Sequence, residues 1–217
     1  MQEVREMTAM PPVDRGLPDR AVIYLARHGQ TPLNETDALR GHQEPPLDET
    51  GHKQARQLAA AIGAVGLTGV FASPSARARQ TAQPIADQAG LNLAIDGRFR
   101  DRDYGQWTGQ SRTSVRARWG AIDRAPGVES RAAVTDRAMD GLIEIARAHR
   151  HGSAAVVSHD AVNRLLLVAF RPELGDPDAI PQGNGCFNVL LWCGDRFTVL
   201  TVNEEPRGLC GPEPPQA

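Results

Sequence analysis

The chain has 217 residues, a formal net charge of −2 at pH 7 and only 5% aromatic residues. This length suits one α/β domain with a sizeable core. The near-neutral charge gives no support for binding nucleic acid or a membrane surface through bulk electrostatics. The three cysteines have no C-x-x-C spacing, which argues against a disulfide framework and a zinc site. Since no apolar run could cross a bilayer and residues 1–20 lack the apolar centre of a signal peptide, we expect a cytoplasmic protein.

Apolar segments alternate along the chain with amphipathic ones. Residues 1–20 are predicted to form a flexible leader, residues 21–205 one domain, and residues 206–217 a disordered proline-rich tail. After a first apolar run, strands are predicted over 68–73, 91–95, 154–158, 186–193 and 196–202, and helices over 49–63, 75–89, 130–149 and 160–170. This order predicts an α/β fold, a three-layer α/β/α sandwich with a mainly parallel central sheet.

The first apolar run begins at Val22 and ends abruptly in Arg27, His28 and Gly29. In open α/β sheets, ligands bind at the carboxyl ends of the strands. An arginine there can hold phosphate oxygens with two donors, and a neutral histidine can attack phosphorus through a ring nitrogen. The three-residue motif alone fits an ordinary strand-end histidine equally well. The surrounding residues therefore have to decide between the two interpretations.

The longer segment Leu25–Asn34 resembles the L-x-R-H-G-x-T-x-x-N signature of the histidine phosphatase superfamily, branch 1, the phosphoglycerate mutase-like proteins. The resemblance implies a phosphoglycerate mutase-like fold with a phosphohistidine intermediate on His28. It also implies that phosphate and substrate are held by residues of this segment. These residues are Arg27, Gln30, Thr31 and Asn34.

Two further segments resemble later motifs of the same family. Residues 73–82 resemble S-x-x-x-R-A-x-x-T-A, which implies that Arg77 clamps the phosphate at the first turn of a helix, where anions are favoured. Arg79 is a rival, but it points to another helix face. His159 follows the apolar run 154–158 and matches the second histidine of the family. It is expected to stabilise charge as the phosphoryl group transfers.

Two aspartates compete in the sequence for the role of proton donor. Residues 99–109 resemble the loop L-x-E-x-x-x-G-x-W-E-G, whose donor glutamate is replaced by Asp101, while Thr108 replaces its second glutamate. An aspartate can serve if its pKa is raised, and Asp103 is a less favoured neighbour. Asp160 remains the rival, since His159 followed by Asp160 resembles the donor pair of the acid phosphatase and phytase branch. We rank Asp101 first.

Taken together, these matches predict a phosphomonoester hydrolase that acts on a small phosphorylated metabolite without a cofactor or metal ion. Gln30 and Leu33 stand where the mutases of the family have glutamate and tryptophan, and the stretch 109–126 is too short for the mutase insertion. Phosphoglycerate mutase activity is the first alternative, and a catalytically weak phosphate-binding regulatory protein is the second. Selectivity is expected to come from the loops 30–45, 102–125 and 180–185, and a homodimer remains open.

Overall fold

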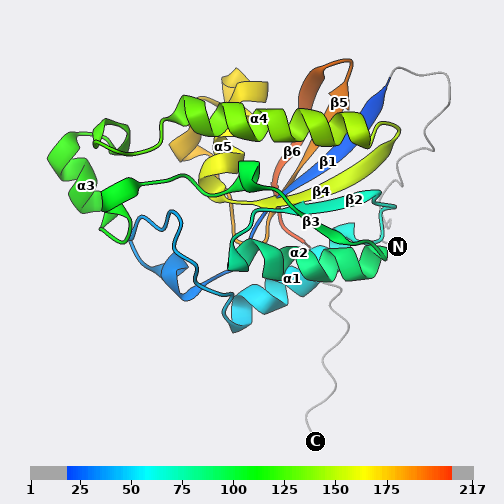
Figure 1. The fold of residues 1–217 in the computed structure, drawn as a ribbon, viewed down its shortest axis with the longest axis horizontal. Helices are drawn as coiled ribbons and strands as arrows, with labels where there is room; N and C mark the ends of the chain where they lie inside the picture. Colours follow the sequence, from blue (N-terminus) through cyan, green and yellow to red (C-terminus); the bar gives the residue numbers. More distant parts are fainter. Residues whose placement is uncertain (1–18, 207–217) are drawn as a thin grey trace, which may run out of the picture.

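A six-stranded sheet lies between two pairs of helices in the computed structural model, which describes residues 19–206 (Figure 1). The strands are β1 (Arg20–Arg27), β2 (Gly69–Ala72), β3 (Leu93–Ile95), β4 (Gly152–Ser158), β5 (Phe187–Cys193) and β6 (Arg196–Glu204). They are arranged in the order β3-β2-β4-β1-β5-β6. The pairs joining β1 to β4, β2 to β4 and β2 to β3 are parallel, whereas β5 runs antiparallel to both of its neighbours. The predicted α/β fold with a mainly parallel central sheet is confirmed.

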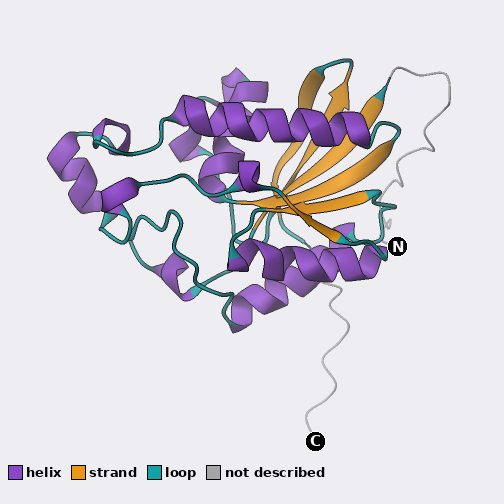
Figure 2. Ribbon diagram, viewed as in Figure 1, coloured by secondary structure: helices purple, strands orange, loops and turns teal. Residues whose placement is uncertain are grey.

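Helices cover both faces of this sheet (Figure 2). They are α1 (Glu49–Ile62), α2 (Ala76–Ala89), α3 (Arg112–Trp119), α4 (Arg131–Ala148) and α5 (Asp160–Phe170). The pair α1 and α2 lies on one face and the pair α4 and α5 on the other (Figure 1). Four of them begin where a polar side chain accepts a hydrogen bond from the first turn, at Asp48, Ser75, Ser111 and Ser130.

The central strands are buried on both faces, which explains why the sequence shows them as continuous apolar runs. Ile23 and Leu25 of β1 pack into the cluster under α4 and α5, whereas Ala26 packs into the cluster under α1 and α2. In β4 the consecutive residues Val156 and Val157 likewise pack into the first and the second of these clusters. This alternation follows from the two-residue repeat of a strand, and it holds the ends of β1 and β4 rigidly in the middle of the molecule.

Two details differ from the sequence prediction. The strand β1 begins at Arg20, a residue assigned to the leader, while the other expectations for 1–18 and 207–217 fall outside the described residues. The segment 102–125, predicted as a loop, contains helix α3. Only Val115 of α3 is buried, so the helix has no apolar periodicity to reveal it. A small cluster apart from the main core supports it, formed by Leu39, Tyr104, Trp107, Val115, Ile122 and Ala125.

None of the helices within residues 19–206 combines the length and the apolar character that a membrane span requires. The cysteines of this part of the chain, Cys186 and Cys193, are free thiols, and Cys210 lies outside it. The late strands β5 and β6 form the predicted hairpin. It turns at Gly194 and Asp195, both with positive φ, as a type I′ hairpin turn requires.

Candidate active site

The register of the central strands brings the two predicted histidines together. Arg27 at the end of β1 pairs with Ser158 at the end of the parallel neighbour β4. His28 and His159 each follow by one residue, so their rings lie side by side with centroids 5.2 Å apart. Both side chains are completely buried. On the other side of β4, strand β2 ends just before Ser73, which places a third strand end at the same edge of the sheet.

The hydrogen bonding of His28 leaves one ring nitrogen free. Its Nδ1 lies 2.7 Å from the carbonyl oxygen of Gly29, and because a carbonyl only accepts, Nδ1 carries the proton. The other nitrogen, Nε2, is buried and has no partner among the described residues. Burial, together with the charges of Arg27 and Arg77, holds the pKa of His28 well below 6.5. His28 is therefore a neutral imidazole with an available lone pair, the state that a nucleophile needs.

The backbone after His28 is held by the first halves of α1 and α2. A side chain at Gly29 would place its Cβ 2.6 Å from the carbonyl oxygen of Gly51, and a side chain at Gly51 would overlap the carbonyl of Gln30. The amide of Gln30 donates to the Oε1 atom of Gln54 at 2.8 Å, and that of Gly29 to the hydroxyl of Thr81 at 2.9 Å. The close approach explains why both positions are glycines.

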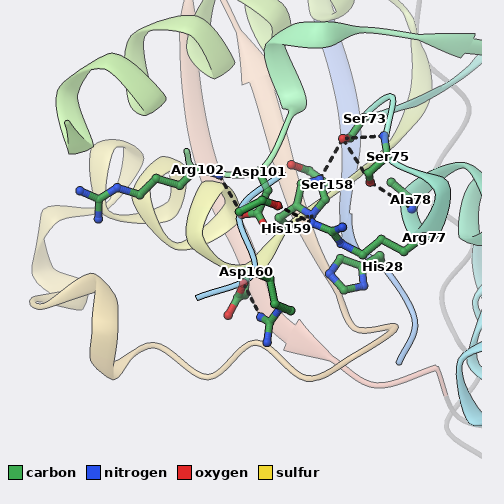
Figure 3. Close-up of polar contacts among 12 residues, drawn as sticks. His28, Ser73, Ser75, Arg77, Ala78, Asp101, Arg102, Ser158, His159 and Asp160 are labelled. Atoms are coloured by element: carbon green, nitrogen blue, oxygen red, sulfur yellow. Dashed lines mark hydrogen bonds and ion pairs between the residues drawn. The ribbon is translucent and has the colours of Figure 1, made fainter. Parts of the chain in front are cut away.

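Arg77 extends from the first turn of α2 towards His159 and Asp101 (Figure 3). Its guanidinium group is completely buried and donates to Oδ2 of Asp101 at 2.9 Å and to the carbonyl of Gln43 at 2.6 Å. The same group lies 3.3 Å from Nδ1 of His159. Arg79, the rival from the sequence, is exposed on the surface of α2. Of the two arginines, only Arg77 reaches the histidines.

The contacts of His159 determine its protonation as well. Nδ1 accepts from Arg77, which has no acceptor of its own, so the proton of the neutral ring is on Nε2 and is donated to the hydroxyl of Ser73 at 2.9 Å. Burial, with the charge of Arg77 and the neighbouring His28, holds the pKa of His159 well below 6.5. Both histidines are consequently neutral, and the arginines carry the positive charge of the site.

The two candidate proton donors lie in opposite electrostatic environments. Asp101 is 4% exposed, and burial together with the charge of Asp160 raises its pKa, although Arg77 opposes the shift. Burial would also raise the pKa of Asp160, but the charges of Arg27 and Arg40 outweigh it and hold that pKa below its usual range. Asp101 is therefore the carboxyl group that more readily keeps a proton, and Asp160 is the one that stays ionised.

A network that sequence reasoning missed holds the loop of Asp101. Arg137, on α4, donates to the carbonyl oxygens of Arg98 at 2.6 Å and Arg100 at 2.8 Å. Its Nε also donates to Oε1 of Glu129 at 2.8 Å, and Oε2 of Glu129 accepts from the amide of Asp103 at 3.0 Å. Glu129 belongs to a segment that resembled a family motif, but nothing in the sequence connects it with Arg137. Together the two side chains position the backbone that carries the donor.

The remaining predicted binding residues divide into two groups. Arg27 donates to the carbonyl of Gln182 and lines a cavity of about 330 Å³ together with Asn34. The Oδ1 atom of Asn34 accepts from the amide and hydroxyl of Thr31, at 2.9 and 2.8 Å, so Thr31 is buried behind it. The side chain of Gln30 donates to exposed Glu35 at 3.0 Å and does not line the cavity. Arg27 and Asn34 thus face the open part of the site.

The donors of the site are guanidinium and imidazole nitrogens. Within residues 19–206, no group of three or more histidine, cysteine, aspartate or glutamate side chains is arranged to hold a metal ion. A phosphate group that enters beside His28 would meet Arg27 and Arg77, whose planar groups can each bind two oxygens. The arrangement can therefore hold an anion next to a neutral nucleophilic nitrogen and a carboxyl group.

Known proteins are similar to this chain in sequence and in fold. The protein named "Uncharacterized phosphatase PhoE" from Bacillus subtilis (strain 168) is 30% identical over 183 residues, which cover 83% of this chain and 93% of that protein. The mycobacterial glucosyl-3-phosphoglycerate phosphatase, solved with VO3, superposes with a TM-score of 0.72 at 25% identity, over 85% of this chain and 98% of that one. Phosphoglycerate mutase from Bacillus anthracis str. Sterne has the same fold, with a TM-score of 0.78 at 19% identity and coverages of 87% and 95%. The family profile of the histidine phosphatase superfamily (branch 1) matches residues 23–205, and the chain belongs to this superfamily.

Proposed function

We propose that the protein is a cytoplasmic phosphomonoester hydrolase that works through a phosphohistidine at Nε2 of His28 and needs no metal ion. One observation carries the proposal: this nitrogen is deprotonated, buried and without a partner among the described residues, and the guanidinium group of Arg77 contacts the adjoining His159. Membership of a superfamily whose relatives include named phosphatases supports the same chemistry.

Substrate binding prepares the proton donor. In the free site, Arg77 is the ion-pair partner of Asp101, at 2.9 Å. An entering phosphate dianion competes for the same guanidinium group and brings its own negative charge close to the carboxyl group. Both effects disfavour the carboxylate, so they raise the pKa of Asp101 beyond its already raised value. Binding thereby favours the protonated acid that the first chemical step uses.

The reaction then has two steps. In the first, Nε2 of His28 attacks phosphorus, the bond from phosphorus to the ester oxygen breaks, and Asp101 gives its proton to the departing oxygen. In the second, the Asp101 carboxylate takes a proton from a water molecule whose oxygen attacks the phosphohistidine. The phosphorus–nitrogen bond breaks, which releases inorganic phosphate and returns neutral His28. Arg27 and Arg77 stay bound to the phosphoryl oxygens throughout, because phosphoryl transfer depends mainly on positioning and charge stabilisation.

Two alternatives use the same site. A mutase would pass the phosphoryl group back to the substrate, and a regulatory protein would bind phosphate without turning it over. Glutamine at position 30 and leucine at position 33, in place of the glutamate and tryptophan of the mutases, favour hydrolysis. Product analysis with 3-phosphoglycerate separates the first alternative, since a mutase yields 2-phosphoglycerate and a phosphatase yields free phosphate.

The decisive experiment measures hydrolysis of p-nitrophenyl phosphate in the presence of EDTA. We expect activity in the wild type and almost none in His28→Ala. His52→Ala is the matched control, since His52 is an exposed histidine of α1 outside the site, and it should behave as the wild type. Loss of wild-type activity on adding EDTA would contradict the metal-free mechanism, and normal turnover by His28→Ala would contradict the nucleophile.

A further inference from the structure

Two adjoining cavities open beside the phosphate-binding arginines, with volumes of about 360 and 330 Å³. The second cavity is lined by Asn34 and by Arg27, the residue before His28, so it lies next to the site of transfer, although His28 and Arg77 line neither cavity. The first extends from it between α3, α5 and the segment around Pro177. The two share five lining residues, which mark the passage between them: Arg112, Arg116, Asp160, Arg164 and Asp178. The part of a substrate that is not transferred can occupy this space.

The charges that line these cavities do not balance. Seven arginines and five aspartates line them, and no lysine, glutamate or histidine does. Most of the aspartates already have an arginine partner. The ion pairs are Arg40–Asp160 at 3.4 Å, Arg102–Asp123 at 2.6 Å, Arg116–Asp178 at 2.9 Å, and those of Arg131 with Asp123 at 2.8 Å, Asp178 at 3.2 Å and Asp176 at 3.6 Å. The surplus of positive charge therefore belongs to arginines outside these pairs.

Two arginines at the passage have no carboxylate of their own. Arg112 and Arg164 make no side-chain hydrogen bond or ion pair with any residue in 19–206, and Nε of Arg164 is sealed from solvent without an acceptor. The nearby carboxylate of Asp37 is occupied, because it accepts from the hydroxyl of Ser111 at 2.6 Å and from the amide of Thr113 at 3.0 Å. The carboxylates whose charges reach these arginines, Asp37 and Asp160, are engaged by other donors, so both guanidinium groups keep donors free for an anionic group of a ligand.

The wall of the first cavity is partly apolar. Tyr104, Ile122, Leu165 and Pro177 line it and can contact a carbon skeleton. We propose that Arg112 and Arg164 bind a second anionic group on the leaving group of the substrate. The physiological substrate is then a phosphomonoester that also carries a carboxylate or a second phosphate. This inference rests on the proposed hydrolase function and specifies its substrate class.

Arg27 also lacks an ion pair among the described residues, but it does not weaken the assignment. It lies next to the nucleophile at the end of β1 and is needed for the phosphoryl group that is transferred. Arg112 and Arg164 come from α3 and α5 and line both cavities. They are therefore placed to hold a different group from the one that His28 attacks.

The test uses pairs of substrates that differ in one anionic group. The first pair is 3-phosphoglycerate and glycerol 3-phosphate, which differ only in a carboxylate. The second is glucose 1,6-bisphosphate and glucose 6-phosphate, which differ in a phosphate. We expect kcat/KM of the wild type to favour the anionic member of at least one pair by roughly 10- to 100-fold, the range of a charge-assisted hydrogen bond. The pair that shows the preference tells a carboxylate from a phosphate.

Arg112→Gln and Arg164→Gln should each lower this ratio towards one, chiefly through KM of the anionic member. Arg171→Gln is the matched control, since it removes an exposed charge at the end of α5 outside both cavities, and it should keep the wild-type ratio. Equal kcat/KM within both pairs, or a ratio that neither glutamine variant lowers, would overturn the inference and leave the hydrolase proposal standing.

Calorimetric binding to His28→Ala separates the two proposals when turnover is absent. If the wild type hydrolyses none of the four compounds, the hydrolase proposal fails for them. Tighter binding of an anionic member to His28→Ala, lost when Arg112→Gln is added, would still support the second anion site. Equal binding of both members in each pair would refute it.

Discussion

Asp101→Asn gives the sharpest test of the proposed chemistry, because it removes the proton and keeps the shape of the side chain. A general acid contributes about 10²- to 10⁴-fold when the leaving group is a basic alkoxide. A p-nitrophenolate leaves without protonation. The buried carboxyl group, with its raised pKa, is expected to supply this whole factor. Hydrolysis of glycerol 3-phosphate should therefore fall by about 10²- to 10⁴-fold, whereas phosphorylation of the enzyme by p-nitrophenyl phosphate should change far less.

The assay is stopped-flow release of p-nitrophenol followed by steady-state turnover. In Asp101→Asn the second step lacks its base, so we expect a burst of product equal to the enzyme concentration and then slow turnover, with phosphohistidine accumulating. Asp103→Asn is the matched control on the same loop. Its side chain is 49% exposed, and an asparagine oxygen can still accept from the amide of Gly105. This variant should show neither the loss nor the burst.

Asp160→Asn distinguishes the rival donor. Because the pKa of Asp160 is lowered and its carboxylate pairs with Arg40, we expect this variant to alter KM and to lower kcat/KM for both substrates by similar factors. A loss confined to the alkyl phosphate in Asp160→Asn, with Asp101→Asn nearly normal, would refute our assignment. A p-nitrophenol burst that slows in Asp101→Asn by as large a factor as the hydrolysis of glycerol 3-phosphate would show that the residue supports the structure and does not donate the proton.

Two further predictions concern stability. Gly51→Ala should lower the free energy of urea unfolding by about 1–3 kcal/mol, and activity with it, because its Cβ would overlap the carbonyl of Gln30. Gly97→Ala is the control, since no atom among the described residues lies near its Cβ, and it should change neither quantity. Equal effects of the two substitutions would contradict this reasoning. Because the pKa values of His28 and His159 are lowered in the folded protein, the unfolded chain binds protons at these histidines at a higher pH than the folded chain does. Their contribution to stability is therefore present above pH 6.5 and is lost as the pH falls below it. We expect the free energy of unfolding to change with pH by up to about 1.4 kcal/mol per pH unit for each histidine. Urea unfolding at pH 7.5, 6.5 and 5.5 should show a shallower pH dependence in His159→Asn. An unchanged pH dependence in that variant would count against two buried neutral histidines.

Elements whose signal is local were predicted well from the sequence. Strands β1 and β4 are buried on both faces, so each reads as an apolar run, and helices α1, α2 and α4 begin at the side-chain caps Asp48, Ser75 and Ser130. Helix α3 was missed because it is stabilised mainly by residues that are distant in the sequence. It buries only Val115, and it is held by contacts with Leu39, some seventy residues away in the chain. No window of the local sequence contains that information.

The residues of the site follow the same division. His28, Arg77 and His159 were predicted together because each follows a strand end, and parallel strands bring their ends to one edge of a sheet. The direction of a side chain at a loop position carries no such signal. Gln30 was predicted to bind phosphate or substrate, but its amide group turns to Glu35 at the surface. The Glu129–Arg137 pair was invisible for the same reason, since only the fold brings α4 to the donor loop.

The choice between Asp101 and Asp160 shows most clearly what only the structure supplies. Both aspartates follow motifs, and both are acids of the same intrinsic strength, so the sequence could rank them only by resemblance. Their difference comes from the charges around them. Asp160 lies among the arginines Arg27 of β1, Arg40 of the loop after it and Arg164 of α5, whereas Asp101 pairs with Arg77, feels Arg40 less strongly and has a neighbouring carboxylate. Because the substrate itself engages Arg77, the Asp101 carboxyl group can hold a proton at the moment of transfer. The surrounding arginines keep Asp160 ionised, which suits it to hold Arg27 and Arg40 in place.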